Sequence, residues 1–354
     1  MSSTVPTRAD LAALPSYVPG RTVPGAIKLA SNEVPGGPLP SVREAISQAA
    51  TQVNRYPDMG AWALVDRLAT ELGLPADRVA VGGGSVMLCQ QLVQAMCGPG
   101  DDVLFAWRSF EAYPILIQIA NAHAVTVPLD ATHTHDLDAM AAAVTPRTRL
   151  LFVCNPNNPT GTAVRRDALT RFLDAVPPEV LVVLDEAYRE FVTDDEVPDG
   201  LALAEERPNV AVLRTFSKAY GLAGLRVGYA VAPPEVTTAL RKVYVPFSVN
   251  AVAQAAAIAS LDAKDELLAR CRDIVSERTR VRDALLAAGY VVPETQANFV
   301  WLPLGDRATE FAEHALASKV VVRPFAGDGV RVTIGTPEEN DVFLDAARSF
   351  QQRE

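Results

Sequence analysis

Short apolar runs alternate with polar or glycine-containing loops and amphipathic stretches between about Val79 and Val231. Within the runs, apolar and polar residues do not alternate, which is typical of strands that are covered on both faces. The pattern predicts an α/β domain with a mainly parallel sheet, whose ligands bind at the carboxyl ends of the strands. The runs that we expect to be strands are 79–81, 102–107, 150–154, 181–184, 210–214 and 227–231.

The pattern changes after Pro246, where long helix-compatible stretches are followed by short strand candidates. We therefore predict a large domain of residues 48–247 and a smaller α/β domain of residues 248–354, joined by the amino-terminal arm, residues 1–47. The later part of the chain has helix candidates at 250–261 and 266–289 and strand candidates at 298–304, 319–325 and 329–335.

Composition limits the class of protein. The 354 residues are 49% hydrophobic and 21% charged, which is typical of a globular chain with a large core. A net charge of −10 disfavours nucleic acid and anionic membranes as partners. No apolar run reaches the roughly 20 residues of a membrane span, and the four cysteines have no CxxC spacing. We expect a cytoplasmic protein with reduced thiols.

The stretch VAVGGGSV places Gly84 and Ser85 where a strand runs into a helix. Backbone N–H groups and the helix dipole at such a position suit a phosphate, although a strand-to-helix turn without a ligand is an equally good interpretation. The stretch lacks the last glycine of GxGxxG and the GK[ST] of a nucleotide-binding loop. Dinucleotide and ATP sites are therefore disfavoured.

Two further strand ends carry polar side chains. Asp185 ends the apolar run LVVLD, and its carboxylate either caps the next helix or pairs with a buried cation. The protonated ring nitrogen of pyridoxal phosphate is such a cation. Asn158 lies in the stiff turn NPNNPTG, which is either an ordinary loop or a rigid support from which the Asn158 amide can donate to a ligand oxygen.

Lys218 follows the run VAVLR within LRTFSKAYGLAGLRVGY. A lysine at a strand end is most often a solvated edge residue. In a dry pocket, however, its amine has a lowered pKa and becomes a nucleophile that forms Schiff bases. Ser217 and Arg226 would then hold the phosphate of the aldehyde that Lys218 attacks.

The motifs NPNNPTG, DEAY and SKAYGLAGLRVGY, in this order, resemble the fold type I aminotransferases that use pyridoxal 5'-phosphate. The resemblance extends from about Leu14 to Phe350 and is greatest to the histidinol-phosphate and aromatic-amino-acid branch. It implies the fold of that family, with a large domain around a mainly parallel sheet and a smaller α/β domain, and it implies pyridoxal 5'-phosphate as the cofactor.

The same resemblance implies roles for individual residues. Lys218 would carry the cofactor and move the proton of the substrate's α-carbon, while Asp185 would pair with the pyridine nitrogen. Asn158 and Tyr188 would bond the phenolic oxygen, and Phe110 would stack on the ring, where many relatives carry tyrosine. Gly84, Ser85, Ser217 and Arg226 match phosphate-binding positions.

Other matched positions concern the substrate and a second subunit. Tyr56 in NRYPD matches a tyrosine that reaches the cofactor phosphate of the neighbouring subunit, which implies a homodimer; packing on its own domain is the alternative. Arg331 matches the arginine that clamps the substrate's α-carboxylate, rather than an exposed edge residue. Tyr17 and Asn32 match an arm that closes over the substrate, and Arg323 lines the same pocket.

The stretch THTHD places His133 and His135 beside Asp136, which superficially resembles a metal site. No further ligand lies at a fitting distance in sequence, so we expect a solvated turn and no metal.

We predict an aromatic amino acid aminotransferase of the phenylalanine type, which passes the amino group to 2-oxoglutarate by a ping-pong mechanism. The choice rests on the resemblance of Phe110 and the arm sequences to that branch. Histidinol-phosphate aminotransferase is the alternative, because Arg323 and Tyr17 could serve a substrate phosphate. A β-lyase or decarboxylase with the same cofactor also stays open, whereas the glycine pattern disfavours a nicotinamide dehydrogenase.

Overall fold

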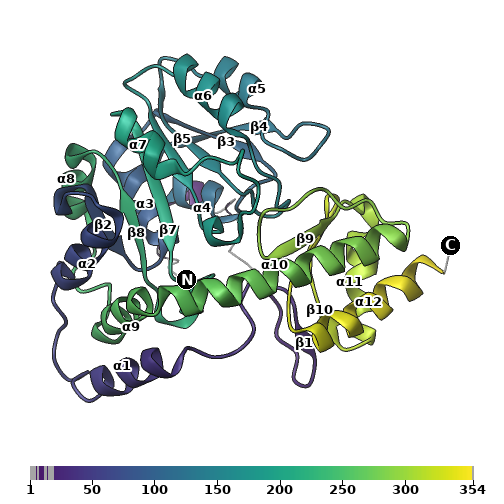
Figure 1. Ribbon diagram of the computed structural model, residues 1–354. Helices are drawn as coiled ribbons and strands as arrows, with labels where there is room; N and C mark the ends of the chain where they lie inside the picture. The colour runs from purple at the N-terminus through teal and green to yellow at the C-terminus, as the bar shows by residue number, and fades with distance from the viewer. Residues whose placement is uncertain (1–4, 6–7, 12–13, 15–19, 353–354) are drawn as a thin grey trace.

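The computed structural model describes residues 5, 8–11, 14 and 20–352. In this part of the chain, the largest sheet has seven strands in the order β2-β8-β7-β6-β5-β3-β4 (Figure 1). The neighbouring strands from β4 to β7 are parallel, and β8 is antiparallel to β2 and β7. The predicted mainly parallel sheet is confirmed. Its strands are β2 (Val79–Gly82), β3 (Asp102–Trp107), β4 (His123–Pro128), β5 (Thr148–Cys154), β6 (Leu181–Asp185), β7 (Val210–Thr215) and β8 (Gly228–Val231).

Apolar and polar residues do not alternate along the central strands because each face of the sheet is covered by its own hydrophobic core. Along β6, Val182 and Leu184 belong to one buried cluster, whereas Leu181 and Val183 belong to the other. Both faces thus exclude water, and apolar side chains are favoured at every position. The helices around this sheet are α2 (Trp62–Leu72), α3 (Ser85–Met96), α4 (Ala112–Ile119), α5 (Leu137–Ala142), α6 (Arg166–Ala175), α7 (Gly200–Glu206) and α8 (Pro234–Val243).

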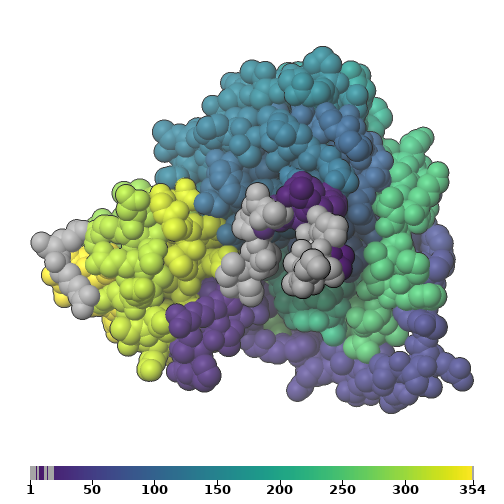
Figure 2. Space-filling view, turned by 180° about the vertical axis from the view of Figure 1, so that it is seen from behind, coloured from purple at the N-terminus to yellow at the C-terminus, as the bar shows by residue number. Residues whose placement is uncertain are grey.

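The carboxyl-terminal part contains a second, antiparallel sheet in the order β11-β12-β9. The N-terminal segment joins this part, because β1 pairs in parallel with β10, and Figure 2 shows the purple N-terminal segment against the yellow-green C-terminal residues. The elements are β1 (Ile27–Lys28), β9 (Phe299–Leu302), β10 (Val320–Val321), β11 (Arg323–Phe325), β12 (Gly329–Thr333), α11 (Ala308–Ala317) and α12 (Pro337–Gln351).

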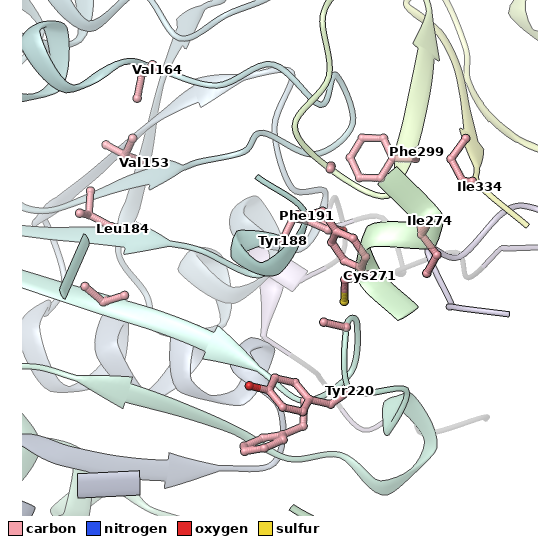
Figure 3. Packing of buried hydrophobic residues seen from close by; sticks show 14 of the residues in the cluster. Val153, Val164, Leu184, Tyr188, Phe191, Tyr220, Cys271, Ile274, Phe299 and Ile334 are labelled. Atoms are coloured by element: carbon pink, nitrogen blue, oxygen red, sulfur yellow. The ribbon is translucent and has the colours of Figure 1, made fainter. Parts of the chain in front are cut away.

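One buried cluster connects the two sheets. Tyr188 and Phe191, just after β6, lie near Cys271 and Ile274 of α10 (Lys264–Ala287) and near Phe299 of β9 (Figure 3). The ring centroids of Tyr188 and Phe299 are 5.1 Å apart, in an edge-to-face arrangement. The small sheet is therefore packed directly behind the residues that follow the end of β6.

The helices between the two sheets differ slightly from the expected ones. The stretches predicted at 250–261 and 266–289 form α9 (Ala251–Asp262) and α10 (Lys264–Ala287). Because α9 packs against α1 (Pro40–Ala50) and α2, it lies beside the large sheet, and α10 runs from there to the small sheet (Figure 1). The predicted domain limits stay a prediction. No helix among the described residues has the length and apolar character to cross a bilayer.

A buried ion cluster holds the loop after β6 to β7. Arg214 donates two hydrogen bonds to Oε2 of Glu186, at 3.0 and 2.7 Å, and a third to Oδ1 of Asp199 at 2.7 Å. Oε1 of Glu186 accepts from the backbone N–H of Gly200 at 2.7 Å. Since Glu186 and Arg214 are buried, each charge depends on the other for compensation.

We expect Arg214→Met to lower the free energy of unfolding by about 3 kcal/mol, because Glu186 then stays buried without its cation. Urea denaturation, followed by circular dichroism, measures the change. Arg165→Met is the matched control, because Arg165 pairs with Asp194 at the surface with 60% of its side chain exposed, and we expect a loss of about 1 kcal/mol or less. Equal losses in the two variants would contradict the prediction.

Candidate functional site

A cavity of about 220 Å³ lies at the carboxyl ends of β6 and β7, between the large sheet and the small one. Ser31 and the backbone around it close one side of this cavity. Eleven of the residues predicted as ligand contacts line it: Asn32, Ser85, Phe110, Asn158, Asp185, Tyr188, Ser217, Lys218, Arg226, Arg323 and Arg331.

Asp185 ends β6 and is buried in the wall of this cavity. Its Oδ2 accepts a hydrogen bond of 2.7 Å from the hydroxyl of Tyr113 on α4, while its Oδ1 has no hydrogen-bond partner among the described residues. Burial raises the pKa of the Asp185 carboxyl to about 6, although the bond from Tyr113 acts in the opposite direction. The site therefore has a buried acceptor that a cationic or N–H donor group would satisfy.

Lys218 lies in the loop after β7 and lines the same cavity. Its Nζ donates to the backbone carbonyl of Ser31 at 3.2 Å. Burial lowers the pKa of the Lys218 amine to about 7, and the positive charge of Arg331 adds to this effect. A large fraction of the amine is thus neutral near pH 7, which is the form that attacks a carbonyl.

Arg226 and the start of α3 form a cradle for an anion. The Arg226 Nη1 donates to Oγ of Ser217 at 3.1 Å and to the carbonyl of Ala223 at 3.0 Å. Gly84 precedes Ser85 with φ +83°, and a Cβ at Gly84 would overlap the Arg226 guanidinium. Only glycine permits this approach, so the guanidinium lies against the N-terminus of α3, where backbone N–H groups favour negative charge.

Asn158 and Arg331 lie together on the side of the small sheet. The Arg331 side chain, from β12, donates to Oδ1 of Asn158 and, at 2.9 Å, to the carbonyl of Ala30. The carbonyl oxygen of Asn158 is an acceptor in this contact, which makes its NH₂ group the end that can donate to a ligand oxygen. Arg331 is buried and presents its charge to the cavity.

Asn32 connects the N-terminal segment with both sheets. Its Nδ2 donates to the hydroxyl of Tyr188 at 2.8 Å, and its backbone N–H donates to Oγ1 of Thr333 at 2.9 Å. Tyr188 in turn lies close to Lys218, whose Nζ is 5.9 Å from the centroid of the tyrosine ring. The predicted arm residue is therefore part of the cavity wall.

Three predicted positions lie outside the cavity lining. Gly84 does not line the cavity itself, but it lies against Arg226 and precedes Ser85, which both do. Tyr56 is 83% exposed and stacks on Phe247 with ring centroids 4.5 Å apart, so it does not reach the cavity of its own chain. Tyr17 lies outside the described residues.

The prediction of a solvated THTHD turn was wrong for His135, which is buried. The cause is a backbone bridge between Leu129 and His135, which folds the loop back on the strand that precedes it. Burial lowers the pKa of the His135 imidazole to about 4. Among the described residues, no group of three or more His, Cys, Asp or Glu side chains is placed to hold a metal ion.

Several contacts of the site have a weak signal in the sequence or none at all. Tyr113, which holds Asp185, is three residues after Phe110, so helical spacing is a signal that could have linked them. The carbonyl of Ser31 carries no signal in the sequence, because any residue supplies a backbone oxygen. The cavity is also lined by Gly20, Ala30, Ser31, Val86, Cys154, Ala187 and Thr215.

Comparisons with known proteins agree over nearly the whole chain. Residues 24–346 match the family model described as aminotransferase class I and II. An aromatic amino acid aminotransferase of Rhodococcus jostii is 63% identical, over 98% of this chain and 96% of the relative. One of Streptomyces coelicolor is 59% identical, over 99% of both chains. A histidinol-phosphate aminotransferase of Sinorhizobium meliloti, solved in complex with pyridoxal-5'-phosphate, superposes with a TM-score of 0.89 at 29% identity, covering 99% of each chain.

The lowered pKa of Lys218 is testable by reductive methylation of the cofactor-free protein with formaldehyde. Only the neutral amine reacts, so we expect the methylation rate of Lys218 to be half-maximal near pH 7 and to rise above that pH. Mass spectrometry of the Lys218 peptide measures the rate, with the exposed Lys242 as the internal reference. Arg331→Gln removes a charge that lowers the pKa, so the midpoint should move upward. A Lys218 profile identical to that of Lys242 would refute this assignment.

Proposed function

This chain belongs to the class I and II aminotransferases, which use pyridoxal 5'-phosphate, and we propose that it transfers the amino group of an aromatic amino acid such as phenylalanine to 2-oxoglutarate. The geometric observation that carries this proposal is that one cavity contains both the Lys218 amine and the buried Asp185 oxygen that has no hydrogen-bond partner among the described residues. The aromatic donor is supported by relatives of this name that are about 60% identical over nearly the full length.

The residues present fit the cofactor. Oδ1 of Asp185 would accept from a protonated ring nitrogen, and the cradle of Ser85, Ser217 and Arg226 would hold the phosphate. Phe110 would stack on the ring, while Asn158 and Tyr188 would bond its phenolic oxygen.

When bound, pyridoxal phosphate supplies an aldehyde carbon and a ring that withdraws electrons from the substrate's α-carbon. Nζ of Lys218 takes the proton from the α-carbon of the amino donor, and in the second half-reaction it returns a proton to the α-carbon that the 2-oxo acid contributes. The Arg331 guanidinium binds the α-carboxylate through a bidentate pair. The donor would leave as a 2-oxo acid while its amino group is retained with the cofactor, and the acceptor would bind afterwards, which gives ping-pong kinetics.

Histidinol-phosphate transamination is the second candidate. A structural neighbour of that name covers 99% of this chain, and Arg323 lines the cavity beside Arg331. Identity to this neighbour is 29%, far below that to the aromatic amino acid aminotransferases. We therefore rank it second.

The proposal predicts that the purified protein forms phenylpyruvate and glutamate in equal amounts from phenylalanine and 2-oxoglutarate. Product identification by mass spectrometry distinguishes this reaction from those of a lyase or a decarboxylase. Lys218→Ala should lower kcat by about 10³-fold or more, because the proton-transferring amine is lost, whereas Lys242→Ala at the surface should not. Normal turnover of Lys218→Ala, or a strong preference of the wild type for histidinol phosphate, would sink the proposal.

We also propose that the protein acts as a cytoplasmic homodimer in which Tyr56 reaches the cofactor phosphate of the partner subunit. Support comes from the exposed apolar side chains around Tyr56, which include Val53, Met59, Trp62 and Phe247, each more than a third exposed. Such a cluster is typical of a surface that is covered in the assembly. The four cysteines are all unpaired, which fits a reducing compartment.

A mixture of two inactive variants tests the shared site. If Tyr56 serves the partner's site, a dimer of one Lys218→Ala and one Tyr56→Ala subunit has one site with both residues intact. Random exchange of subunits should then restore about a quarter of the wild-type activity, since half of the dimers are hybrids with one working site. Measured activity no greater than that of the two variants kept apart would show that Tyr56 acts only within its own chain.

A further inference from the structure

An ion pair lies in the wall of the cavity, on the side of the small sheet. Nη2 of Arg323, on β11, donates to Oε2 of Glu111 at 2.8 Å, and the two side chains are only 12% and 29% exposed. Arg323 lines the cavity. Glu111 follows Phe110 directly in the chain and precedes the first residue of α4. The pair therefore joins the small sheet to the segment that carries the proposed ring-stacking residue.

Arg323 is also the neighbour of the proposed carboxylate clamp. Arg323 and Arg331 are directly opposite each other on the antiparallel strands β11 and β12, so their side chains leave the sheet on the same face. Both guanidinium groups lie near the ring of Phe325, at 5.6 and 5.7 Å from its centroid. Two positive charges on the same face of the sheet, both near the ring of Phe325, would form a site for an anion with more than one negative charge.

Glu111 changes this charge balance. The α-carboxylate of an amino acid carries one negative charge, which Arg331 alone can match. A phosphate monoester carries between one and two negative charges near pH 7, and it gains most from a second cation. With its charge matched by Glu111, Arg323 offers much less attraction to the second charge, and the Glu111 carboxylate repels it.

On the basis of the proposed function, we propose that Glu111 is a specificity-determining residue that selects substrates with a single carboxylate over substrates with a phosphate. It acts through Arg323, so it is a positioning residue and not a catalytic one. The aromatic side chain of the donor would then lie against a cavity wall in which the charges of Arg323 and Glu111 are paired and the ring of Phe325 is near.

The test compares Glu111→Gln with the wild-type holoenzyme. The amide keeps the size of the side chain and removes its charge. The first measurement is the dissociation constant, by calorimetry, of two unreactive ligands that share a phenyl ring and differ in their anion, 3-phenylpropionate and 2-phenylethyl phosphate. We expect Glu111→Gln to bind the phosphate about tenfold more tightly relative to the carboxylate. The ratio of kcat/KM for histidinol phosphate to that for phenylalanine should rise by a similar factor, mainly through KM.

Two further variants control for indirect effects. Asp328→Asn also replaces a carboxylate by an amide, in the ion pair of Asp328 with Arg108 at 2.5 Å. Neither of these residues lines the cavity. This variant should therefore leave the ratio of dissociation constants and the ratio of kcat/KM values unchanged. Arg323→Gln in the Glu111→Gln background should abolish the gain, because Glu111 acts through Arg323. Equal shifts in Asp328→Asn and Glu111→Gln, or a gain that persists without Arg323, would overturn the inference.

The outcome is separable from that of the proposed function. The ligand pair reports the selectivity for anions even if phenylalanine is not turned over. An unchanged ratio of the two dissociation constants in a Glu111→Gln protein with a wild-type melting temperature sinks the role of Glu111 and leaves the transamination proposal intact. A Glu111→Gln protein that fails to fold is replaced by Glu111→Ala, for which the same ratio decides.

Discussion

The carboxylate of Asp185 is the constraint on which the arrangement of the site depends. It ends a strand that is buried on both faces, and one of its oxygens has no partner within the described protein. A buried acceptor without a hydrogen-bond partner is destabilising by about 1–3 kcal/mol, and a donor group on a ligand would remove this cost. Tyr113 fixes the other oxygen, which orients the free one. The free oxygen is thus oriented to accept from a cationic or N–H donor group of a ligand before any ligand binds.

The positive groups of the cavity complement this carboxylate. Arg226 lies against the N-terminus of α3 and Arg331 belongs to the small sheet; both line the cavity together with Lys218, and both lower the pKa of its amine. A ligand that carries a phosphate at one end and a protonated nitrogen at the other satisfies both signs of charge. Burial is the main cause of the lowered pKa of the Lys218 amine, and the positive charges of Arg331 and Arg226 add to it, so the cavity that would bind such a ligand also favours a neutral amine.

Much of this site follows from the sequence, because strand ends in a parallel sheet converge at one edge. Asp185 and Lys218 follow short, mainly apolar runs, and these runs predict their place at the sheet edge without any contact being known. The apolar pattern failed for β4, whose exposed His123 and Thr126 give no continuous run, and it could not predict the antiparallel direction of β8. His135 was misjudged because its burial comes from a fold-back of the loop, which composition does not encode. The Glu111–Arg323 pair spans 212 residues and likewise has no local signal.

The N-terminal segment explains why two sheets can form a single site. Three consecutive residues each hold a different group: the carbonyl of Ala30 accepts from Arg331, that of Ser31 accepts from Lys218, and Asn32 bonds Tyr188. Because these contacts lie within one short stretch of backbone, the positions of the Lys218 amine and the Arg331 guanidinium relative to each other depend on local geometry as well as on the packing of the two sheets. A shift of the small sheet must therefore move the segment, break a contact with it, or do both, and each of these alters the geometry around the amine. The Arg331 guanidinium of the small sheet and the Lys218 amine after β7 are in this way held by one segment of the chain.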